Sequence, residues 1–229
     1  MARRTGTRVW PATIAIVVAG AALAGCAAGQ AGSARPSGFL GDYAQLRAGG
    51  EGQALLVYVD PAARFSTYRK MIIDPVTIWR DEETKDIPPD EAQDLIDDLD
   101  DVLRMTLDDD YQLVKEPGPD VLRLRVAITE AEGSWRVVDG RLGDALDEDL
   151  RAVETKEPSD ATKSFVGKAG VEAEILDTTS GKRLAAAIDR RVGARTLTPE
   201  KNAWSDVERA FRYWADRLRD RLAELRKRS

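Results

Sequence analysis

The feature that most constrains the fold is a strict alternation of side chains from Val121 to Thr129. Every second residue of this run is a branched apolar one: Leu122, Leu124, Val126 and Ile128. Such a period of two is expected of a β-strand that buries one face and leaves the other accessible. The chain must therefore contain a sheet, and the remaining elements have to cover its apolar face.

A second alternating run spans residues 164–177 and is followed by the turn sequence Thr178-Thr179-Ser180-Gly181 and a return run at 182–192. This arrangement predicts a β-hairpin. Within its first strand, Lys168, Glu172 and Glu174 alternate with the apolar residues, so we expect these three on the solvent face. Further strands are predicted at 53–59, 68–79 and 111–115, and Pro75 should mark a sheet edge or a kink within its strand.

Two amphipathic helices are predicted, one from Pro88 to Leu107 and one from Thr198 to the end of the chain. In both, apolar residues recur every three or four positions, which gives each helix one buried stripe. The outer face of the first is rich in Asp, and the second ends in Arg226-Lys227-Arg228. We therefore hypothesise that the helices lie side by side on one sheet face with roughly complementary charges.

These elements predict an α+β fold in one domain, residues 38–229. We expect a mainly antiparallel sheet of about five strands with two long helices packed on one face. Between Glu130 and Ser159 the apolar periodicity fails and glycines accumulate, which indicates a long connection of unassigned role. The three acids Asp108, Asp109 and Asp110 follow the first helix; hydrated carboxylates, an arginine partner and a calcium site are all possible there, although no calcium-loop pattern accompanies them.

The N-terminus has the order of a secretory signal. Arg3, Arg4 and Arg8 come first without an acid, and an apolar run from Trp10 to Ala24 follows. A transmembrane helix is the alternative, but a bilayer core needs ~20 apolar residues and this run is shorter and rich in Ala and Gly. We therefore predict a signal peptide over residues 1–25, removed by cleavage between Gly25 and Cys26.

Leu23-Ala24-Gly25-Cys26 resembles the bacterial lipobox, and Cys26 is the only cysteine. The resemblance implies that the Cys26 sulfur carries a diacylglycerol and that its freed amine is usually acylated too, with palmitate or a similar chain. Cleavage without lipid at a small-residue site is the alternative. Two or more acyl chains would hold the protein stably to a membrane. Because Ala27 is not the Asp that retains many lipoproteins in the inner membrane, the same resemblance favours the outer membrane, facing the periplasm.

Residues 26–37 are small and polar and predict a lipidated flexible tether, whose eleven residues after Cys26 would reach roughly 18 Å. Removal of residues 1–25 would take away three of the 34 basic residues and none of the 40 acidic ones, leaving 31 against 40 and a net charge of −9. An acidic domain of this kind is a poor match to the phosphate backbone of a nucleic acid. We therefore expect no nucleic-acid partner.

The absence of histidine and of a second cysteine limits the chemistry. It rules out His-based acid/base catalysis, Ser-His-Asp triads, zinc sites with His or Cys ligands and disulfides within the domain. We predict no cofactor and no metal. Four residues remain as candidates for interaction with a partner or ligand, although core packing or a chain kink is their more usual role: Asp74, Trp135, Trp204 and Trp214.

Several short segments together resemble one bacterial lipoprotein family. They are Ser37-Gly38-Phe39-Leu40-Gly41-Asp42-Tyr43, Tyr58-Val59-Asp60-Pro61, Ile73-Asp74-Pro75-Val76, Val121-Leu122-Arg123-Leu124-Arg125-Val126, Phe165-Val166-Gly167, Val171-Glu172-Ala173-Glu174-Ile175-Leu176-Asp177, Gly181, Asp189-Arg190-Arg191 and Trp214-Ala215. The family is known as the domain of unknown function number thirty-three thirteen. The resemblance covers the whole mature chain and implies an envelope location and a single domain, but no activity.

Three functions follow as hypotheses. We expect first a non-enzymatic binding or adaptor module, held by its lipid near the outer membrane and contacting an envelope protein or the cell wall. The second is a periplasmic hydrolase, or a divalent-metal enzyme, whose chemistry rests on carboxylates such as Asp74 or Asp189. The third is a carrier of a lipid or other apolar ligand, held between the sheet and the helices.

Overall fold

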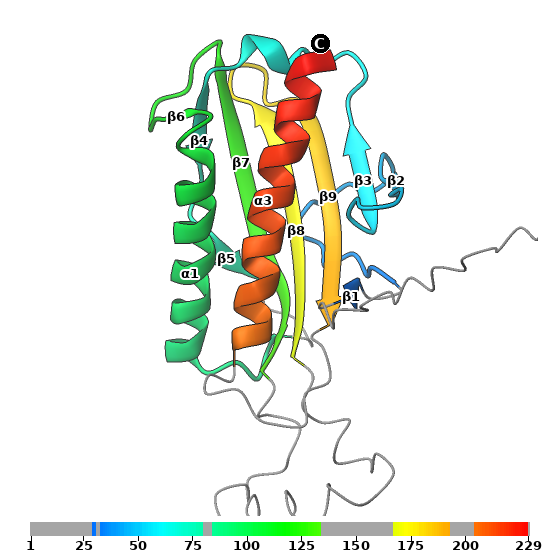
Figure 1. Cartoon of the computed structure of the whole chain (residues 1–229), viewed down its shortest axis with the longest axis vertical. Coiled ribbons are helices and arrows are strands. Elements are labelled where there is room, and N and C mark those ends of the chain that lie inside the picture. Colours follow the sequence, from blue (N-terminus) through cyan, green and yellow to red (C-terminus); the bar gives the residue numbers. More distant parts are fainter. Residues whose placement is uncertain (1–28, 31–32, 80–83, 134–166, 193–203, 229) are drawn as a thin grey trace, which may run out of the picture.

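The computed structural model describes residues 29–30, 33–79, 84–133, 167–192 and 204–228. Within them one nine-stranded sheet carries both long helices over the same face (Figure 1). The strands are β1 (Gly29–Gln30), β2 (Arg47–Ala48), β3 (Leu56–Val59), β4 (Lys70–Ile73), β5 (Thr77–Ile78), β6 (Gln112–Leu113), β7 (Val121–Glu132), β8 (Lys168–Asp177) and β9 (Arg183–Val192). The helices are α1 (Pro89–Leu107) and α3 (Ser205–Arg228), with a short 3-10 turn η1 (Phe65–Thr67).

The α+β class is confirmed, but the predicted five-stranded, mainly antiparallel sheet is wrong in strand number and in direction. The strand order is β2-β3-β9-β8-β7-β4-β6, with β1 added to β9 and β5 added to β7. The long strands β7, β8 and β9 are antiparallel neighbours, whereas β4 pairs in parallel with β6 and β7, and β5 with β7. The sheet is therefore mixed.

The parallel part arises from Pro75 and from α1. The expected strand at 68–79 is split at Asp74-Pro75 into β4 and β5, as the proline predicted, because proline cannot donate to a strand ladder. Both short strands run parallel to β7, since the chain crosses over the sheet through α1 before it returns. Parallel pairing requires such a crossover.

The predicted hairpin is confirmed as β8 and β9, which pair from Lys168 with Val192 to Leu176 with Arg183. Gly181 closes the turn at φ +69°, a left-handed conformation that glycine adopts without steric cost. The helix predicted over 88–107 is also confirmed, and its five fully buried residues form one stripe: Ala92, Leu95, Leu99, Leu103 and Leu107. The predicted start of the last helix at Thr198 lies outside the described residues.

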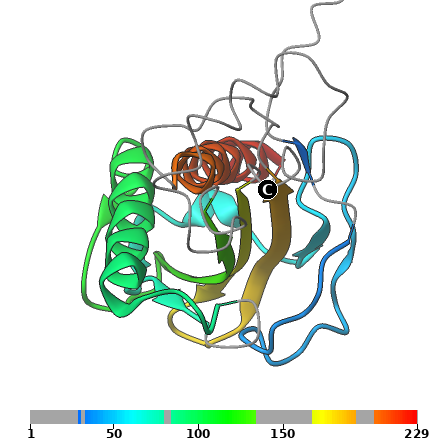
Figure 2. The same cartoon turned by 90° about the horizontal axis from the view of Figure 1, so that it is seen from below.

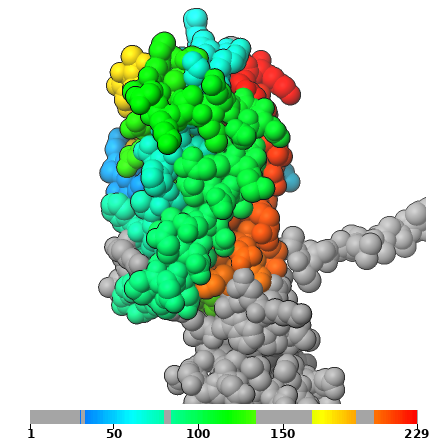
Figure 3. Space-filling view, turned by 90° about the vertical axis from the view of Figure 1, so that its left-hand side faces the viewer, coloured from blue at the N-terminus to red at the C-terminus, as the bar shows by residue number. Residues whose placement is uncertain are grey.

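The main core lies between this sheet face and the two helices, with Phe211, Ala215 and Leu222 of α3 packed among β-strand residues such as Leu124 and Ile175. In the view from below, α1 and α3 occupy the left and upper sides of the sheet (Figure 2). Seen from the side of α1, that helix fills most of the surface and α3 runs along its edge (Figure 3). The two helices thus share one face of the sheet, as predicted.

The opposite sheet face is covered too, which the sequence did not predict. The N-terminal segment, residues 33–48, lies along it (Figure 2) and forms a smaller core in which Leu40 and Leu46 pack on Ala186 and Ile188. Glu172 and Glu174, expected in solvent, are 0% and 3% exposed there. The prediction was wrong because residues 33–48, a distant segment with no periodicity of its own, lie over this face. Ser37, Leu40 and Tyr43 of that segment donate to Glu172, whereas Glu174 pairs with Arg125 of β7 and Arg183 of β9.

The two helices have complementary charges at their C-terminal ends. There, Arg226 forms an ion pair with Asp110 at 2.8 Å and donates to the Asp110 carbonyl oxygen at 3.1 Å. Asp110 thus has the arginine partner that was one of the three alternatives for the acids after α1. Towards the N-terminal ends, Asp98 of α1 lies near Glu208 of α3; burial first, and then this like charge, raises the pKa of Asp98.

Tyr68 connects the turn η1 to the β8–β9 hairpin, since its hydroxyl donates to Asp177 Oδ2 at 2.8 Å. Burial, followed by this hydrogen bond, raises the pKa of Tyr68 to about 12. Because an unfolded tyrosine ionises near pH ~10, the stability contributed by neutral Tyr68 is complete below pH ~10 and is lost as the pH rises towards ~12.

We therefore expect the free energy of unfolding to fall more steeply over this window in the natural chain than in Tyr68→Phe. Urea titrations at pH 9, 10, 11 and 12 measure the difference. Tyr43 and Tyr111, whose pKa values burial also raises, are present in both proteins and act as the internal control. Parallel pH curves for the two proteins would show that Tyr68 ionises without a cost to the fold.

Candidate functional site

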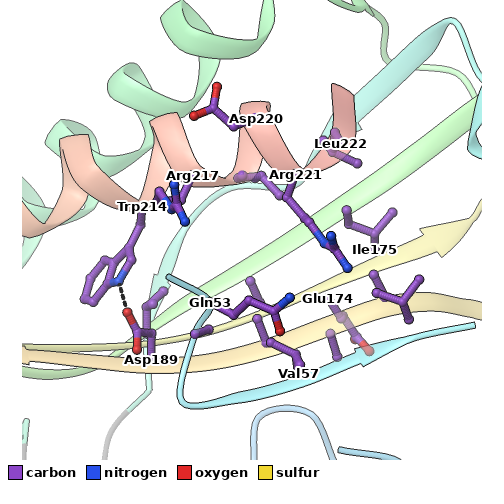
Figure 4. A pocket seen from close by; sticks show the side chains of 18 of the residues that line it. Gln53, Val57, Glu174, Ile175, Asp189, Trp214, Arg217, Asp220, Arg221 and Leu222 are labelled. Atoms are coloured by element: carbon purple, nitrogen blue, oxygen red, sulfur yellow. Dashed lines mark hydrogen bonds between the residues drawn. The ribbon is translucent and has the colours of Figure 1, made fainter. Parts of the chain in front are cut away.

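A cavity of about 280 Å³ lies between α3 and the sheet, at the side of the molecule where β3 runs (Figure 4). Its walls come from β3, β7, β8 and β9, from α1 and α3, and from the loop at 51–54. Most of the lining is aliphatic: Val57, Val59, Leu99, Leu103, Leu124, Val126, Val171, Ile175, Leu218, Leu222 and Leu225. The site is therefore an apolar space inside the main core, open at its β3 side.

The cavity exists because small residues form its floor where α3 crosses the sheet. Ala173 of β8 and Ala185 and Ala187 of β9 all line it, and the strand register places Ala173 opposite Ala187. Interiors are otherwise packed with few voids larger than a water molecule, so three alanines facing a helix leave volume that leucines would fill. The same Leu184-Ala185-Ala186-Ala187 run has a high helix propensity but lies in a strand, because tertiary pairing overrides propensity.

One end of the cavity is polar and centres on Asp189, which is 4% exposed. Its Oδ2 accepts the indole N–H of Trp214 at 2.7 Å, drawn as the dashed line in Figure 4. Its Oδ1 accepts the Gln30 amide at 2.8 Å and the Leu55 backbone N–H at 3.2 Å. Buried acids need such partners, and this carboxylate joins β1, the start of β3, β9 and α3.

The open side of the cavity carries charged residues of both signs. Arg217 and Arg221 of α3 line it, and so do Glu51, Asp220 and Glu224. Arg217 donates to the Gly52 carbonyl oxygen, which ties α3 to the loop before β3, and Arg221 pairs with Glu224 at 2.8 Å. In Figure 4 the Arg221 side chain points from the helix towards the sheet. The rim is thus polar and ion-paired, while the interior is apolar.

The candidate residues from the sequence are not brought together. Trp214 lines the cavity, whereas Trp204 is half-buried at the other end of α3, beside Asp94, Asp97 and Asp98 of α1. Asp74 lies at the kink between β4 and β5, with Arg123 Nε 3.6 Å from its carboxylate. Trp135, Gly25 and Cys26 lie outside the described residues. Only Trp214 and the acid Asp189, named for the hydrolase hypothesis, belong to the same site.

The carrier hypothesis named the space between the sheet and the helices, but the cavity and the residues that line it were not predicted, and one signal pointed to them. Three alanines occupy inward positions of neighbouring strands, where Val, Ile or Leu is usual for a sheet under two helices. Such a small-residue patch marks either close approach of a helix or empty space, and the sequence does not distinguish the two.

Two further observations concern metal ligands and membrane-spanning helices. Among the described residues, no three acidic or cysteine side chains gather in a way that would hold a metal ion. Neither α1 nor α3, nor any other helix in the described ranges, has an apolar stretch long enough to cross a bilayer.

Comparison with known proteins gives a family and distant structural similarities. Residues 35–218 match the profile of the family described as "Protein of unknown function (DUF3313)". No curated protein sequence matches the chain. Among solved structures, the PelC dodecamer from Paraburkholderia phytofirmans is 15% identical, with a TM-score of 0.38, and the match covers 71% of this chain and 94% of that one.

Two other solved structures show similarity at 10% identity. Protein XCC0632 from Xanthomonas campestris matches over 75% of this chain and 94% of its own, with a TM-score of 0.38. A DUF4136 family protein, BT2437 from Bacteroides thetaiotaomicron, matches over 74% of this chain and 95% of its own, with a TM-score of 0.32. None of these similarities bears on the ligand, partner or assembly of this chain.

Proposed function

We propose that this protein, which belongs to the DUF3313 family of proteins of unknown function, binds an apolar chain in the cavity between α3 and the sheet. The observation that supports this function is the cavity itself: about 280 Å³ with a lining that is mostly aliphatic and polar groups only at its end and rim. Ligand sites in proteins have this construction, an apolar wall with few polar groups.

The size and chemistry of the cavity define the ligand. A water molecule or a methylene group takes up roughly 30 Å³, so the cavity holds about nine such groups. An unbranched aliphatic chain of about nine or ten carbons fits, and burying it is favourable by ~0.8 kcal/mol per CH₂. We therefore propose a single acyl or alkyl chain, or the end of a longer one, as the ligand.

The lipobox places this binding module at a membrane in our proposal. Lipidation of Cys26, an outer-membrane location and contact with an envelope protein or the cell wall remain proposals that rest on the sequence. Binding an apolar chain is the third hypothesis from the sequence, a carrier of a lipid or other apolar ligand held between the sheet and the helices. It also names a ligand for the binding module of the first hypothesis. The hydrolase hypothesis has less support, because Asp74 and Asp189 are in different places and Asp189 accepts three hydrogen bonds that hold elements together.

A photoreactive ten-carbon alcohol with a terminal diazirine tests the proposal. The natural chain, in membranes of cells that express it, is irradiated with this probe, and the labelled peptides are identified by mass spectrometry. We expect labelling of β8, β9 and α3 peptides that line the cavity. Ala173→Leu and Ala185→Leu each add three carbons, about a third of what the cavity holds, and should lower this labelling several-fold.

The matched control is Ala223→Leu, the same substitution on α3 at a residue outside the cavity lining. It should leave labelling unchanged. Filling a real cavity keeps or raises the melting temperature, so thermal unfolding of the two cavity variants shows that they are folded. Labelling that the cavity substitutions do not change, in folded variants, would contradict the proposed function.

A further inference from the structure

The stretch that the sequence predicts as a flexible tether contributes an edge strand to the sheet. Gly29 pairs with Val192 and Gln30 with Arg191, so β1 extends the β9 edge beyond β3. The Gln30 side chain adds two hydrogen bonds, from Nε2 to the Gln53 carbonyl oxygen and to Asp189 Oδ1, each 2.8 Å long. The chain is thus fixed to the domain only three residues after Cys26.

The strand β1 is attached at the cavity. Gln53 and Asp189, the two residues that accept hydrogen bonds from Gln30, both line it, and Asp189 also holds Trp214 of α3. Arg191, the register partner of Gln30, stacks on Tyr213 with its guanidinium 3.8 Å from the ring centroid. Tyr213 lines the cavity as well. Whatever holds residue 26 therefore lies close to the open side of the cavity.

Chain lengths make this placement specific. Three extended residues span at most ~11 Å, which limits the distance from Cys26 to Gly29. The β8–β9 turn, by contrast, lies a full ten-residue strand away from the Lys168–Val192 pair, about 33 Å at ~3.3 Å per residue. A lipid on Cys26 would hold one end of the domain at the bilayer and the hairpin turn far from it.

The side chains around β1 suit a bilayer surface. Tyr213 lies close to two guanidinium groups, those of Arg191 at 3.8 Å and Arg217 at 6.0 Å from its ring centroid. Tyrosine and arginine are favoured at the level of lipid headgroups, where an apolar body meets a charged tip. Glu51 and Asp220 also lie on the rim of the cavity, so the attraction of the arginines to lipid headgroups acts only close to the bilayer surface. The affinity for the membrane comes from the acyl chains on Cys26.

We propose that β1 holds the domain in one fixed orientation, with the open side of the cavity against the bilayer that holds Cys26. This inference rests on the lipid anchor of the proposed function and extends it, since it makes a membrane lipid the source of the bound chain. The anchor then serves to orient the cavity as well as to retain the protein.

Fluorescence energy transfer to headgroup-labelled lipids tests the orientation. The processed, lipidated protein is reconstituted into vesicles of phosphatidylethanolamine and phosphatidylglycerol. Single labels are placed at Glu51→Cys, on the rim of the cavity, or at Thr179→Cys, in the exposed hairpin turn. Cys26 is the only natural cysteine, and its sulfur is blocked in the lipidated protein. We expect transfer to be roughly threefold higher from position 51, given the ~33 Å length of β8.

Two insertions of the same twenty-residue Gly/Ser linker distinguish a domain held in a fixed orientation by β1 from a domain that is only tethered to the membrane. Placed between Ala28 and Gly29, the linker adds a reach of roughly 25 Å before β1 and should abolish the difference between the two labels. Placed between Gly32 and Ser33, it leaves β1 on β9 and should preserve the difference, because a longer loop costs little in closure entropy.

The proposed orientation would be overturned by equal energy transfer from the two labels in the natural protein. Equal effects of the two insertions would overturn it as well. A protein that leaves the vesicles would overturn it too, by removing the anchor. In each case labelling by the ten-carbon alcohol still reports on the cavity. Failure of the proposed orientation and failure of ligand binding are therefore distinguishable.

Discussion

Replacing Glu174 by alanine is expected to lower the free energy of unfolding by about 3–5 kcal/mol, the usual effect of removing one partner of a buried ion pair. Glu174 is 3% exposed and lies between two arginines. Its Oε1 pairs with Arg125, and its Oε2 accepts from Arg183 Nε at 2.8 Å. Arg183, mostly buried, would lose its counter-charge while it still holds the Asp42 and Leu40 carbonyl oxygens at 2.6 Å.

Urea unfolding followed by circular dichroism measures this change. Glu132→Ala is the matched control, because Glu132 also pairs across two strands, with Lys168, but its side chain is 31% exposed. An exposed pair contributes ~0–1 kcal/mol, so the control should lose little. A loss of under ~1 kcal/mol in Glu174→Ala would mean that the triad with Arg125 and Arg183 is solvated and that the N-terminal segment does not seal this face.

The secondary structure that could be predicted from the sequence is the part with long periodic patterns. The stripe of α1 and the alternation in β7 each extend over enough residues for the period to be unmistakable, and the turn at Gly181 follows from its turn-forming sequence between two alternating runs. Strands β1 and β2 have two residues each, too few to show a period of two. The strands at β5 and β6 were predicted, but their parallel pairing, of β5 with β7 and of β6 with β4, was not, because strand direction depends on the crossover through α1.

The face assignment failed at Glu172 and Glu174 because alternation reports which side of a strand a residue occupies and not what covers that side. Both acids are on the face opposite the helices, as predicted, but residues 33–48 lie over them. Glu174 accepts from Arg183 within the hairpin, but other partners are distant: Tyr43 is 129 residues from Glu172, and Arg125 is 49 residues from Glu174. No local pattern predicts contacts over such separations.

The candidate site was predictable only in its parts. Trp214 and Asp189 were each named, for different hypotheses, and the structure joins them by a hydrogen bond of 2.7 Å. The cavity between them and β3 depends on how far α3 stands above Ala173, Ala185 and Ala187, which is a property of the packed fold. Volume of this kind arises from side chains that face each other across layers, so a single strand or helix pattern does not contain it.

Replacing Glu172 by alanine should cost about 3 kcal/mol or more, and it should free the N-terminal segment from the sheet. The Glu172 carboxylate is fully buried and accepts the Ser37 N–H at 2.6 Å, the Leu40 N–H at 3.4 Å and the Tyr43 hydroxyl at 2.7 Å. Its loss leaves the Ser37 N–H and the Tyr43 hydroxyl without this acceptor, while the Leu40 N–H keeps a second one, the Tyr43 hydroxyl oxygen at 3.3 Å. Each unsatisfied donor costs ~1–3 kcal/mol unless water enters. Tyr43→Phe removes one donor to Glu172 and also the oxygen that accepts the Gly38 N–H at 2.7 Å. Because that second bond is exposed and water can replace it, this substitution should cost only ~1 kcal/mol.

Hydrogen exchange at the Ser37 and Leu40 amides, together with urea unfolding, separates local release from global loss. If Glu172 clamps residues 37–43, these amides exchange faster in Glu172→Ala while those of α1 remain protected. Unchanged protection at Ser37 would show that the segment is held without the carboxylate. Because Gln30 and Ser37 are bound to the sheet separately, by Asp189 and Glu172, the clamp variant should keep β1 in place. The hydrogen bonds of Gln30 to Asp189 and of Ser37 to Glu172 thus attach the N-terminal segment to the sheet at two separate places.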